Sequence, residues 1–443
     1  MKMGRDQEDV TRVGPGTVMG RFMREYWIPA LRSDELAAGA APIRLLLLGE
    51  KLVAFRDRQG KVGVMDHRCP HRGVSLFMGR VEEDGLRCVY HGWKFNASGQ
   101  CTEMPSVPAH QDFKEKVKTV SYRTAEKAGL IWVYMGSRRD APPLPELEVL
   151  GLPEDEIDVI FLQRQSNWLQ NLESEIDTAH FNFLHVGGLN PDDVPPGHPL
   201  EYTAQGAPAY QVGNTELGTC YAAQTTVDDT RLYTRFAHYM FPFWALIPQG
   251  GIQQNVLARA WVPMDDEHTM MVFIRWNRSG VRPLNEPLKH GEPLPGVTLT
   301  SDFEYQPTST DWYGRWRPMG NESNDWLIDR EAQREGLLFS GIRGIHAQDQ
   351  AMTDSMGAIT DHAWEQLGPS DLMVARTRRR ILQAARAFQE QGGCAPGVDQ
   401  PELYGRERSG YYITPAAVDW RQAYAEQLEM VNRRRTESMQ AAS

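Results

Sequence analysis

Two short segments of the sequence each hold one cysteine and one histidine at a spacing suited to binding a metal. One residue separates Cys69 from His71, two separate Cys88 from His91, and sixteen residues lie between the two segments. Two thiolates and two imidazoles are the ligands of a Rieske [2Fe-2S] cluster, where the thiolates bind one iron and the imidazoles bind the other. Because imidazoles are neutral, such a cluster accepts an electron at a higher potential than an all-cysteine cluster.

The same four ligands also suit a zinc site of the Cys2His2 type. Zinc fingers place cysteine with cysteine and histidine with histidine along the chain. Here each segment contains one of each, which favours the iron-sulfur cluster. A zinc-stabilised binding module remains the alternative, and it would be a colourless protein.

A second group of candidate ligands lies in residues 167–185, which we expect to form a helix. Glu173, Asp177 and His180 are spaced i, i+4 and i+7, so they would share one helical face. His185 follows five residues after His180, roughly 140° further around an ideal helix. The helix must therefore bulge or end between them if both imidazoles are to reach one metal. Two histidines and a distant carboxylate form the facial triad of non-haem Fe(II) oxygenases, which leaves positions open for O2.

Both groups, in this order, resemble the metal motifs of Rieske non-haem iron aromatic-ring-hydroxylating oxygenases, alpha subunit, of the phthalate-dioxygenase type. Residues 69–93 resemble the Rieske domain of these enzymes, and residues 173–185 match their iron-binding pattern E-x3-D-x2-H-x4-H. Val74 and Tyr90 stand where respiratory Rieske proteins carry two further cysteines that form a disulfide. The resemblance is therefore to the oxygenases and not to the respiratory electron carriers.

The resemblance implies which residues would bind the catalytic iron. His180, His185 and Asp349 would hold a mononuclear Fe(II), with Asp349 supplied by a segment near the C-terminal end. Asp354 and Asp361 are the alternatives for the carboxylate ligand, and otherwise they would support the site or cap a helix.

Asp177 has a different implied role, as a catalytic residue in electron transfer. In this family the aspartate links a histidine ligand of the catalytic iron to a histidine ligand of the cluster in a neighbouring subunit, within a ring-shaped homotrimer. By this analogy Asp177 bridges His180 to His91 or His71 across a subunit interface.

Arginines near the expected second sheet are candidates for binding a substrate carboxylate. In phthalate-degrading members, basic residues near this strand clamp the dicarboxylate. In this sequence Cys220 and Gln224 stand where arginine would be expected, while Arg231 and Arg235 remain, so phthalate itself is disfavoured. Arg235 is the candidate for pairing with one carboxylate, because a guanidinium matches carboxylate geometry. A structural or surface ion pair is the alternative role for this arginine.

The implied function is that of the oxygenase component in a multicomponent system of aromatic hydrocarbon catabolism. A Rieske [2Fe-2S] cluster and a mononuclear Fe(II) would use O2 to cis-dihydroxylate an aromatic, carboxylate-like substrate. The electrons would come from a separate NAD(P)H-dependent flavin and iron-sulfur reductase, directly or through a ferredoxin, because the chain has no G-x-G-x-x-G dinucleotide motif. The alternatives are monooxygenation, including O- or N-demethylation, and a Rieske electron-transfer protein without oxygenase activity.

The elements around these motifs predict an α+β protein. Short apolar runs separated by turns predict a small all-β domain at 43–48, 52–55, 62–65, 86–89, 118–122 and 130–135. Further runs predict an antiparallel sheet at 217–224, 232–248, 256–262 and 270–276. With a long helix packed on it, this sheet gives the helix-grip (START/Bet v 1-like) catalytic domain that the resemblance implies.

Four segments follow from this pattern. They are an N-terminal helical segment in 1–40 with a helix near 19–27, the Rieske domain in 41–140, a proline-rich linker in 141–160, and the catalytic domain with C-terminal helices in 161–443. The last segment includes an amphipathic helix after Ser370 that stops at Gly392, with residues 378–380 on its solvated face. Loops at 186–200 and 285–296 are the expected mouth of a substrate pocket.

Composition excludes some other classes of protein. The 443 residues are 41% hydrophobic and 24% charged, and no apolar run approaches the roughly 18 residues that span a bilayer. The net charge of -11 argues against a nucleic-acid partner. Three of the five cysteines lie outside the cluster segments in no recognisable pattern, which suits a reducing compartment, so we expect a cytoplasmic protein.

Overall fold

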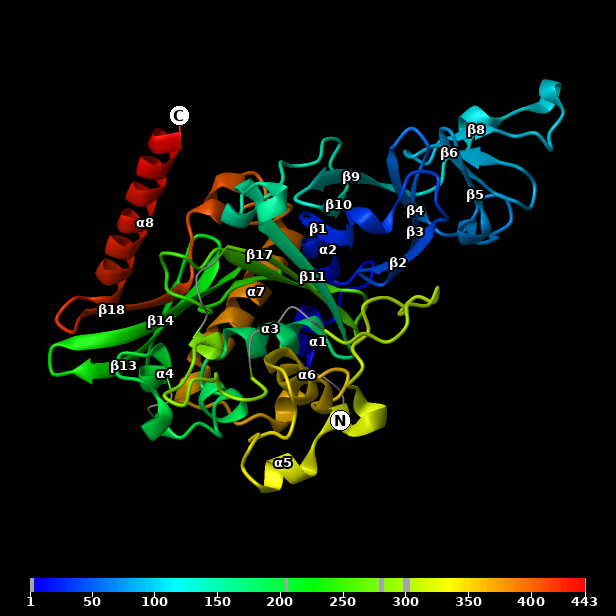
Figure 1. Cartoon of the computed structure of the whole chain (residues 1–443). Coiled ribbons are helices and arrows are strands. Elements are labelled where there is room, and N and C mark those ends of the chain that lie inside the picture. The colour runs from blue at the N-terminus through cyan, green and yellow to red at the C-terminus, as the bar shows by residue number, and fades with distance from the viewer. Residues whose placement is uncertain (1–3, 204–205, 279–282, 298–302, 443) are drawn as a thin grey trace.

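The computed structural model describes residues 4–203, 206–278, 283–297 and 303–442. Within these residues the strands form three sheets (Figure 1). Two sheets make a small all-β part that projects from a larger body, and in the larger body helices pack against the third sheet. The chain is therefore an α+β protein, as the sequence predicts.

The small all-β part contains a six-stranded and a four-stranded sheet, both antiparallel. Two-residue turns at Leu48-Gly49 and Ala128-Gly129 connect strands of the larger sheet, and all four residues have positive φ angles. Such turns match the twist of antiparallel strands. The larger sheet has the order β1 (Trp27–Arg32), β10 (Leu130–Tyr134), β9 (Ser121–Lys127), β4 (Val62–Asp66), β3 (Glu50–Arg56), β2 (Ile43–Leu47). The smaller sheet has the order β5 (Arg80–Glu82), β6 (Gly85–Arg87), β7 (Lys94–Phe95), β8 (Cys101–Glu103).

Two short helices precede these sheets, α1 (Arg5–Thr11) and α2 (Val18–Met23). The predicted helix at 19–27 therefore ends earlier than expected, and Trp27 begins strand β1. All residues from 26 to 31 are buried. A short apolar run that is buried on both faces can form a strand, and β10 is the strand that pairs with this one. Strand β1 thus lies inside the segment expected to be helical.

The larger body is built on an eight-stranded antiparallel sheet. The predicted strand at 232–248 is two strands, β14 and β15, separated by a turn at Pro242, whose nitrogen has no hydrogen to donate to a ladder. Strands β11, β12 and β18 were not predicted, and β11 spans the expected boundary between linker and catalytic domain. The order is β11 (Ile157–Arg164), β17 (Thr269–Trp276), β16 (Leu257–Pro263), β15 (Trp244–Leu246), β14 (Arg231–Met240), β13 (Gly218–Asp228), β12 (Ala209–Asn214), with β18 (Gly410–Pro415) paired to β14.

Helices cover this sheet and position the site. The long helix α7 packs against β13, and the shorter α3 packs against β15, β16 and α6. Helix α7 begins after a short turn at Pro369–Asp371 and ends at Gly392, whose φ of 61° marks a left-handed C-cap. The helices are α3 (Trp168–Ile176), α4 (Pro199–Thr203), α5 (Arg330–Arg334), α6 (Ile345–Ser355), α7 (Leu372–Gln391) and α8 (Trp420–Ala442). Among the described residues, none of the helices has both the length and the apolar content to cross a bilayer.

Arg378 of α7 does not lie on a solvated face, contrary to the sequence prediction. Its guanidinium forms paired hydrogen bonds with the carboxylates of Glu173 on α3 and Glu365 before α7. The side chains of Arg378 and Glu173 are only 16% and 10% exposed. A charge pattern along one helix gives no information about carboxylates that other segments bring to it. This cluster joins α3, the helix that leads to the site, to α7.

Arg378→Met is expected to lower the free energy of unfolding by about 3 kcal/mol, because it leaves two largely buried carboxylates without their cation. Urea unfolding followed by tryptophan fluorescence would measure this change. Arg379→Met is the matched control, since Arg379 is the exposed neighbour on the same helix. Equal stability of the two variants would contradict the role given to the cluster.

Candidate metal centres

The two cysteine-histidine segments form similar loops beside the small sheet. In each loop the glycine four residues after the cysteine, Gly73 or Gly92, has a positive φ and donates its N–H to the carbonyl of Cys69 or Cys88. These glycines close both turns around one ligand pair. The loops place the rings of His71 and His91 with their centroids 4.4 Å apart. The structure therefore brings all four predicted cluster residues to one place.

The donors at this place differ in their exposure. Both cysteines are 3% exposed, whereas His71 is exposed and stacks on the Trp93 ring at 4.4 Å. Burial, together with the adjacent Cys88 thiol, raises the pKa of the Cys69 thiol to about 12. A thiolate at this position therefore needs a metal to hold it in the charged form. The donor set fits an iron-sulfur cluster with its histidine side toward the surface.

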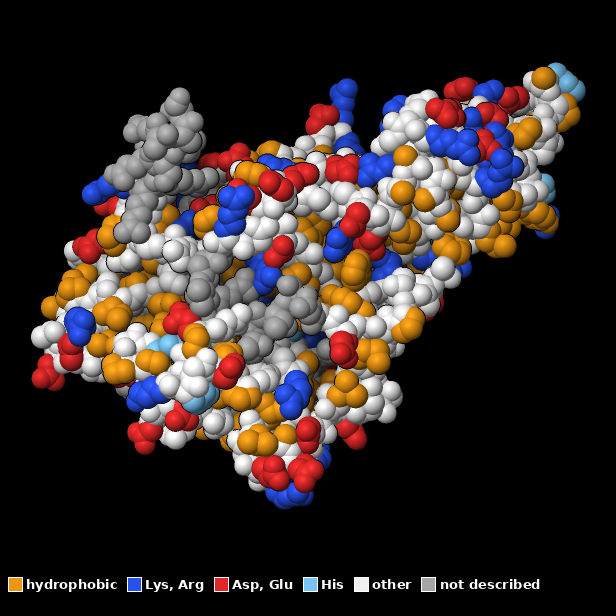
Figure 2. Space-filling model, viewed as in Figure 1, with side chains coloured by type: hydrophobic (Ala, Val, Ile, Leu, Met, Phe, Trp, Pro, Cys, Tyr) orange, Lys and Arg blue, Asp and Glu red, His pale blue; other side chains and the backbone are white. Residues whose placement is uncertain are grey.

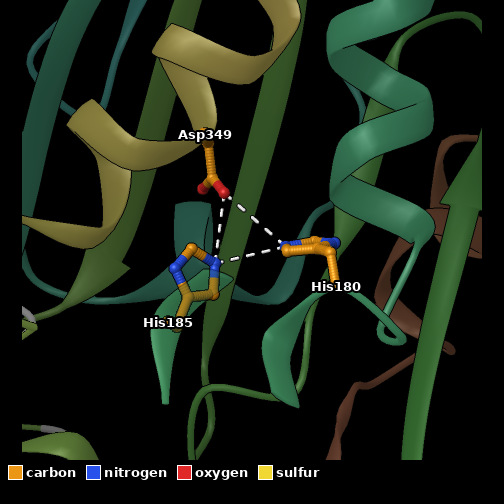
Figure 3. A group of neighbouring side chains, drawn as sticks. All are labelled: His180, His185 and Asp349. Atoms are coloured by element: carbon orange, nitrogen blue, oxygen red, sulfur yellow. Dashed lines mark hydrogen bonds and ion pairs between the residues drawn. The ribbon is translucent and has the colours of Figure 1, made fainter. Parts of the chain in front are cut away.

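A second set of candidate ligands, His180, His185 and Asp349, converges in the larger body, and Figure 3 shows these side chains pointing toward one another. His180 and His185 come from the segment after α3, and Asp349 comes from α6. Their ligand atoms all lie within 4.8 Å of one another. Asp349 Oδ1 is 3.1 Å from His185 Nε2 and 3.6 Å from His180 Nε2, and the two Nε2 atoms are 3.2 Å apart. This is the geometry of a two-histidine, one-carboxylate metal site.

The local backbone explains how two histidines five residues apart can converge. Helix α3 ends at Ile176, and Asp177 is extended, with φ of -89° and ψ of 125°. A π-helical turn then spans Phe181–His185. The expected break is present but begins earlier than the sequence suggested. The prediction that Glu173, Asp177 and His180 share one helical face was therefore wrong, because the helix ends before Asp177, and Glu173 points to Arg378 instead.

Both histidines are held through their Nδ1 atoms, which leaves Nε2 facing the centre. His180 Nδ1 lies 3.0 Å from Asp177 Oδ2, and His185 Nδ1 lies 2.7 Å from Gln348 Oε1. The Asp177 carboxylate also accepts the Ala179 N–H at 2.7 Å. These contacts orient the imidazoles in the way that partners of metal ligands usually do.

The Asp349 carboxylate is suited to a cation. Its Oδ1 is buried and has no hydrogen-bond donor among the described residues. Burial would raise the pKa of this carboxyl, but the imidazoles of His185 and His180 outweigh it and hold the pKa well below its usual range. The ionised oxygen and the two Nε2 atoms face one another, which is the arrangement of donors that binds a cation. These residues therefore fit the mononuclear iron.

The alternative carboxylates have other partners. Asp354 Oδ1 accepts the Ser166 hydroxyl at 2.6 Å, and Asp361 caps a short helix by accepting the Ala363 N–H. A further group formed by Glu173, His362 and Glu365 has ligand-like spacing. The Arg378 guanidinium already supplies the positive charge there, so a metal has no role in that group.

A pocket adjoins the three converging residues. Its empty volume is about 700 Å³ with the open mouth included. Leu200 and Leu284, from the two expected mouth loops and their flanks, lie in its wall. The aromatic residues of 239–246 are buried in the core, and the pocket lining contains none of them. The remaining apolar and aromatic lining is Phe181, Tyr221, Ile247, Pro248 and Ile345.

Polar groups in the pocket wall include residues that the sequence did not indicate. Glu175 and Arg259 form an ion pair at 2.6 Å, with both side chains at most 6% exposed. Thr178 in the wall and Gln348, which contacts His185 Nδ1, also escaped prediction, because no spacing of residue types marks them. Arg235, which was predicted, lies in the wall, whereas Arg231 is exposed and pairs with Asp228 outside the pocket.

Two known protein families match separate parts of the chain. Residues 26–121 match the Rieske [2Fe-2S] domain, and residues 133–442 match the family described as LigXa C-terminal domain like. The chain therefore belongs to the Rieske oxygenases, as an oxygenase alpha subunit with a [2Fe-2S] cluster and a mononuclear iron. As one component of a multicomponent oxidoreductase, it takes electrons from a partner protein and uses O2.

The chain is also similar to individual proteins over most of its length. The chain is 66% identical to the oxygenase subunit of 3-chlorobenzoate-3,4-dioxygenase from Comamonas testosteroni, over 97% of this chain and 99% of that one. It is 36% identical to the oxygenase subunit of phthalate 4,5-dioxygenase from Pseudomonas putida, over 93% and 92%. Among solved structures, NdmA from Pseudomonas putida CBB5 has a TM-score of 0.56 at 18% identity, over 86% of this chain and 96% of that one. This last likeness concerns the fold alone, which is the expected Rieske and helix-grip combination.

Proposed function

We propose that the chain is the oxygenase component of an aromatic-carboxylate dioxygenase that acts on ring-substituted benzoates. The observation that carries this proposal is the 66% identity, over nearly the whole chain, to the subunit of 3-chlorobenzoate-3,4-dioxygenase. Because that relative is a dioxygenase, cis-dihydroxylation is favoured over monooxygenation and demethylation. In this reaction the ring gains both atoms of O2 together with two electrons and two protons.

The residue roles within this proposal follow from the geometry. The cluster ligands would be Cys69, His71, Cys88 and His91, and the iron ligands would be His180, His185 and Asp349. When bound, the iron supplies O2 activation and the cluster supplies electrons. The protein orients the imidazoles through their Nδ1 atoms, and the aliphatic walls of the pocket keep bulk water away from the reacting ring.

Arg235 is the proposed anchor for the substrate carboxylate. It lies on β14 in the pocket wall, and its Nε donates to Thr178 Oγ1 at 3.0 Å. Its guanidinium also lies over the Phe181 ring, 4.6 Å from the centroid. Since Thr178 and Phe181 flank His180, the positive charge is held beside the iron ligands. No carboxylate in the described part of the chain forms an ion pair with Arg235, unlike Arg259, so its charge remains for an anionic substrate.

Arg235→Gln is expected to raise KM for 3-chlorobenzoate by about 10–100-fold, because a charge-assisted hydrogen bond contributes about 1.5–3 kcal/mol. We expect a smaller change in kcat, since the carboxylate lies away from the reacting carbons. Substrate-dependent O2 uptake measures both constants. Arg231→Gln is the matched control on the same strand, where the arginine is exposed and pairs with Asp228 at 2.6 Å. An unchanged KM in Arg235→Gln would show that another group binds the carboxylate.

We propose a homotrimer in which each iron receives electrons from a neighbouring subunit. In Figure 1 the β5–β8 sheet, which carries the cluster loops, lies at one end of the molecule, away from α3 and α6. Hydrophobic side chains gather on the viewed face of this all-β part (Figure 2). Val89 and Tyr90, within one cluster loop, are 51% and 52% exposed. The Asp177 side chain is 23% exposed, so a partner's histidine can reach it. A second copy of the chain would bring the two centres together.

The cluster needs an external source of electrons, and the protein needs a compartment that keeps its thiols reduced. We propose an NAD(P)H-dependent reductase, acting directly or through a ferredoxin, as the partner that reduces the cluster. A cytoplasmic location is supported by the five cysteines, all of which are free of disulfide bonds.

Oxygen-isotope labelling tests the proposed reaction. Purified protein, a reductase and NADH would be supplied with 18O2 and either 3-chlorobenzoate or the neutral analogue chlorobenzene. We expect consumption of O2 with the acid, little with chlorobenzene, and two 18O atoms in the product. One 18O atom in the product would indicate monooxygenation. If no aromatic acid caused O2 uptake, the proposed substrate class would be wrong.

A further inference from the structure

Gln348 is a buried residue that connects one predicted iron ligand to the segment before α6. Its side chain lies on α6 next to Asp349 and is 1% exposed. Its Oε1 is 2.7 Å from His185 Nδ1, and its Nε2 donates to the Ile342 carbonyl at 2.9 Å. Both ends of the amide therefore have a partner.

These two contacts determine where the proton of His185 resides. The Ile342 carbonyl only accepts hydrogen bonds, so the nitrogen of the Gln348 amide must face it and the oxygen must face His185. That oxygen also only accepts, so His185 Nδ1 must carry the hydrogen. In a neutral imidazole, Nε2 is then free of hydrogen. This Nε2 is the atom that faces Asp349 Oδ1 at 3.1 Å and His180 Nε2 at 3.2 Å.

The two histidines are held by partners of different charge. Asp177 holds His180 with a carboxylate, whereas Gln348 holds His185 with a neutral amide. Because Gln348 and Asp349 are consecutive on α6, the position of one helical turn fixes both the carboxylate ligand and the orientation of His185. A small shift of α6 would move two of the three ligand groups together.

We propose that Gln348 is a positioning residue that sets the tautomer and orientation of His185, and through them the affinity of the catalytic site for Fe(II). This inference rests on the proposed iron ligands. The role requires an acceptor that faces His185 Nδ1, and the Gln348 amide supplies it while its nitrogen is held by the Ile342 carbonyl.

Gln348→Met tests the proposal, because methionine has a similar length and flexibility but lacks both the acceptor and the donor. Apoprotein depleted of the mononuclear iron would be titrated with Fe(II), and the EPR signal of the reduced cluster would report an intact Rieske domain. We expect Fe(II) affinity to fall by about 10–100-fold with an unchanged cluster signal. Gln350→Met is the matched control, since Gln350 is 2% exposed on the same helix and donates to the Gly320 carbonyl, away from the histidines.

Two further variants make the outcome decisive. Gln348→Glu keeps an acceptor for His185 Nδ1 and is expected to regain much of the Fe(II) affinity. His185→Ala tests the ligand set itself. Loss of Fe(II) in His185→Ala with wild-type affinity in Gln348→Met would overturn the positioning role. Full Fe(II) binding in His185→Ala would instead show that the proposed ligands are wrong.

Discussion

Asp177→Asn is expected to remove nearly all turnover while both metal centres stay in place. Asparagine keeps the size of the side chain and one oxygen that can accept from His180 Nδ1, now 3.0 Å from Asp177 Oδ2. Iron binding should therefore persist. The substitution removes the negative charge and the second acceptor oxygen, which accepts the Ala179 N–H. We expect substrate-dependent O2 uptake to fall by about 100-fold or more, with iron content and the EPR signal of the reduced cluster unchanged.

A single-turnover experiment separates electron transfer from other causes of this loss. Protein with its cluster reduced beforehand would be mixed with O2 and substrate, and cluster oxidation would be followed by absorbance. In Asp177→Asn we expect slow oxidation of the cluster but normal reduction by the reductase. Asp361→Asn is the control, since Asp361 caps a short helix away from the ligands. Rapid cluster oxidation in Asp177→Asn would contradict the proposed bridging role of Asp177.

The candidate ligands could be proposed from sequence because metal chemistry restricts residue types and local spacing. Cys69, His71, Cys88 and His91 come in two short segments, and a backbone hydrogen bond within each segment closes its turn. The need for a break between His180 and His185 was also predictable, since an ideal helix cannot bring residues five apart to one atom. The place of the break was not, because it depends on how α3 packs on β15, β16 and α6.

The residues around the ligands could not be found in this way, since distant parts of the chain supply them. Gln348 reaches His185 across a separation of 163 residues, and Arg378 reaches Glu173 across 205. Side chains of this kind have no local pattern, and a solvated arginine looks the same in sequence as a buried one. The residues of the pocket wall could not be predicted for the same reason. Which side chains of a strand such as β14 face inward depends on the strands that pair with it.

Asp349→Ala is expected to abolish the mononuclear site and all turnover. Alanine removes the one carboxylate oxygen that lies 3.1 Å and 3.6 Å from the two Nε2 atoms, and two histidines alone bind Fe(II) weakly. We expect purified protein to lose about one iron per chain while the EPR signal of the reduced cluster is retained. Metal analysis and low-temperature EPR after dithionite reduction would measure this.

Thermal unfolding with and without Fe(II) distinguishes loss of a ligand from loss of structure. A ligand that binds only the folded state stabilises it, by about 2.7 kcal/mol at a concentration 100 times Kd. Wild-type apoprotein should therefore gain Tm on addition of Fe(II), and Asp349→Ala should not. In the metal-free state Asp349→Ala should be somewhat less stable than the wild type at neutral pH, because the imidazoles of His185 and His180 lower the pKa of this carboxyl and so favour the folded, ionised form.

Asp354→Ala gives the opposite pattern and serves as the matched control on the same helix. Asp354 accepts the buried Ser166 hydroxyl at 2.6 Å, so its removal should lower Tm by leaving the hydrogen of that hydroxyl without its acceptor. Iron content and the Fe(II)-dependent rise in Tm should remain, because Asp354 has no contact with either histidine ligand. If Asp354→Ala lost the iron and Asp349→Ala kept it, the carboxylate ligand would have to be reassigned to Asp354. If both variants kept it, the metal would be held without a carboxylate from α6.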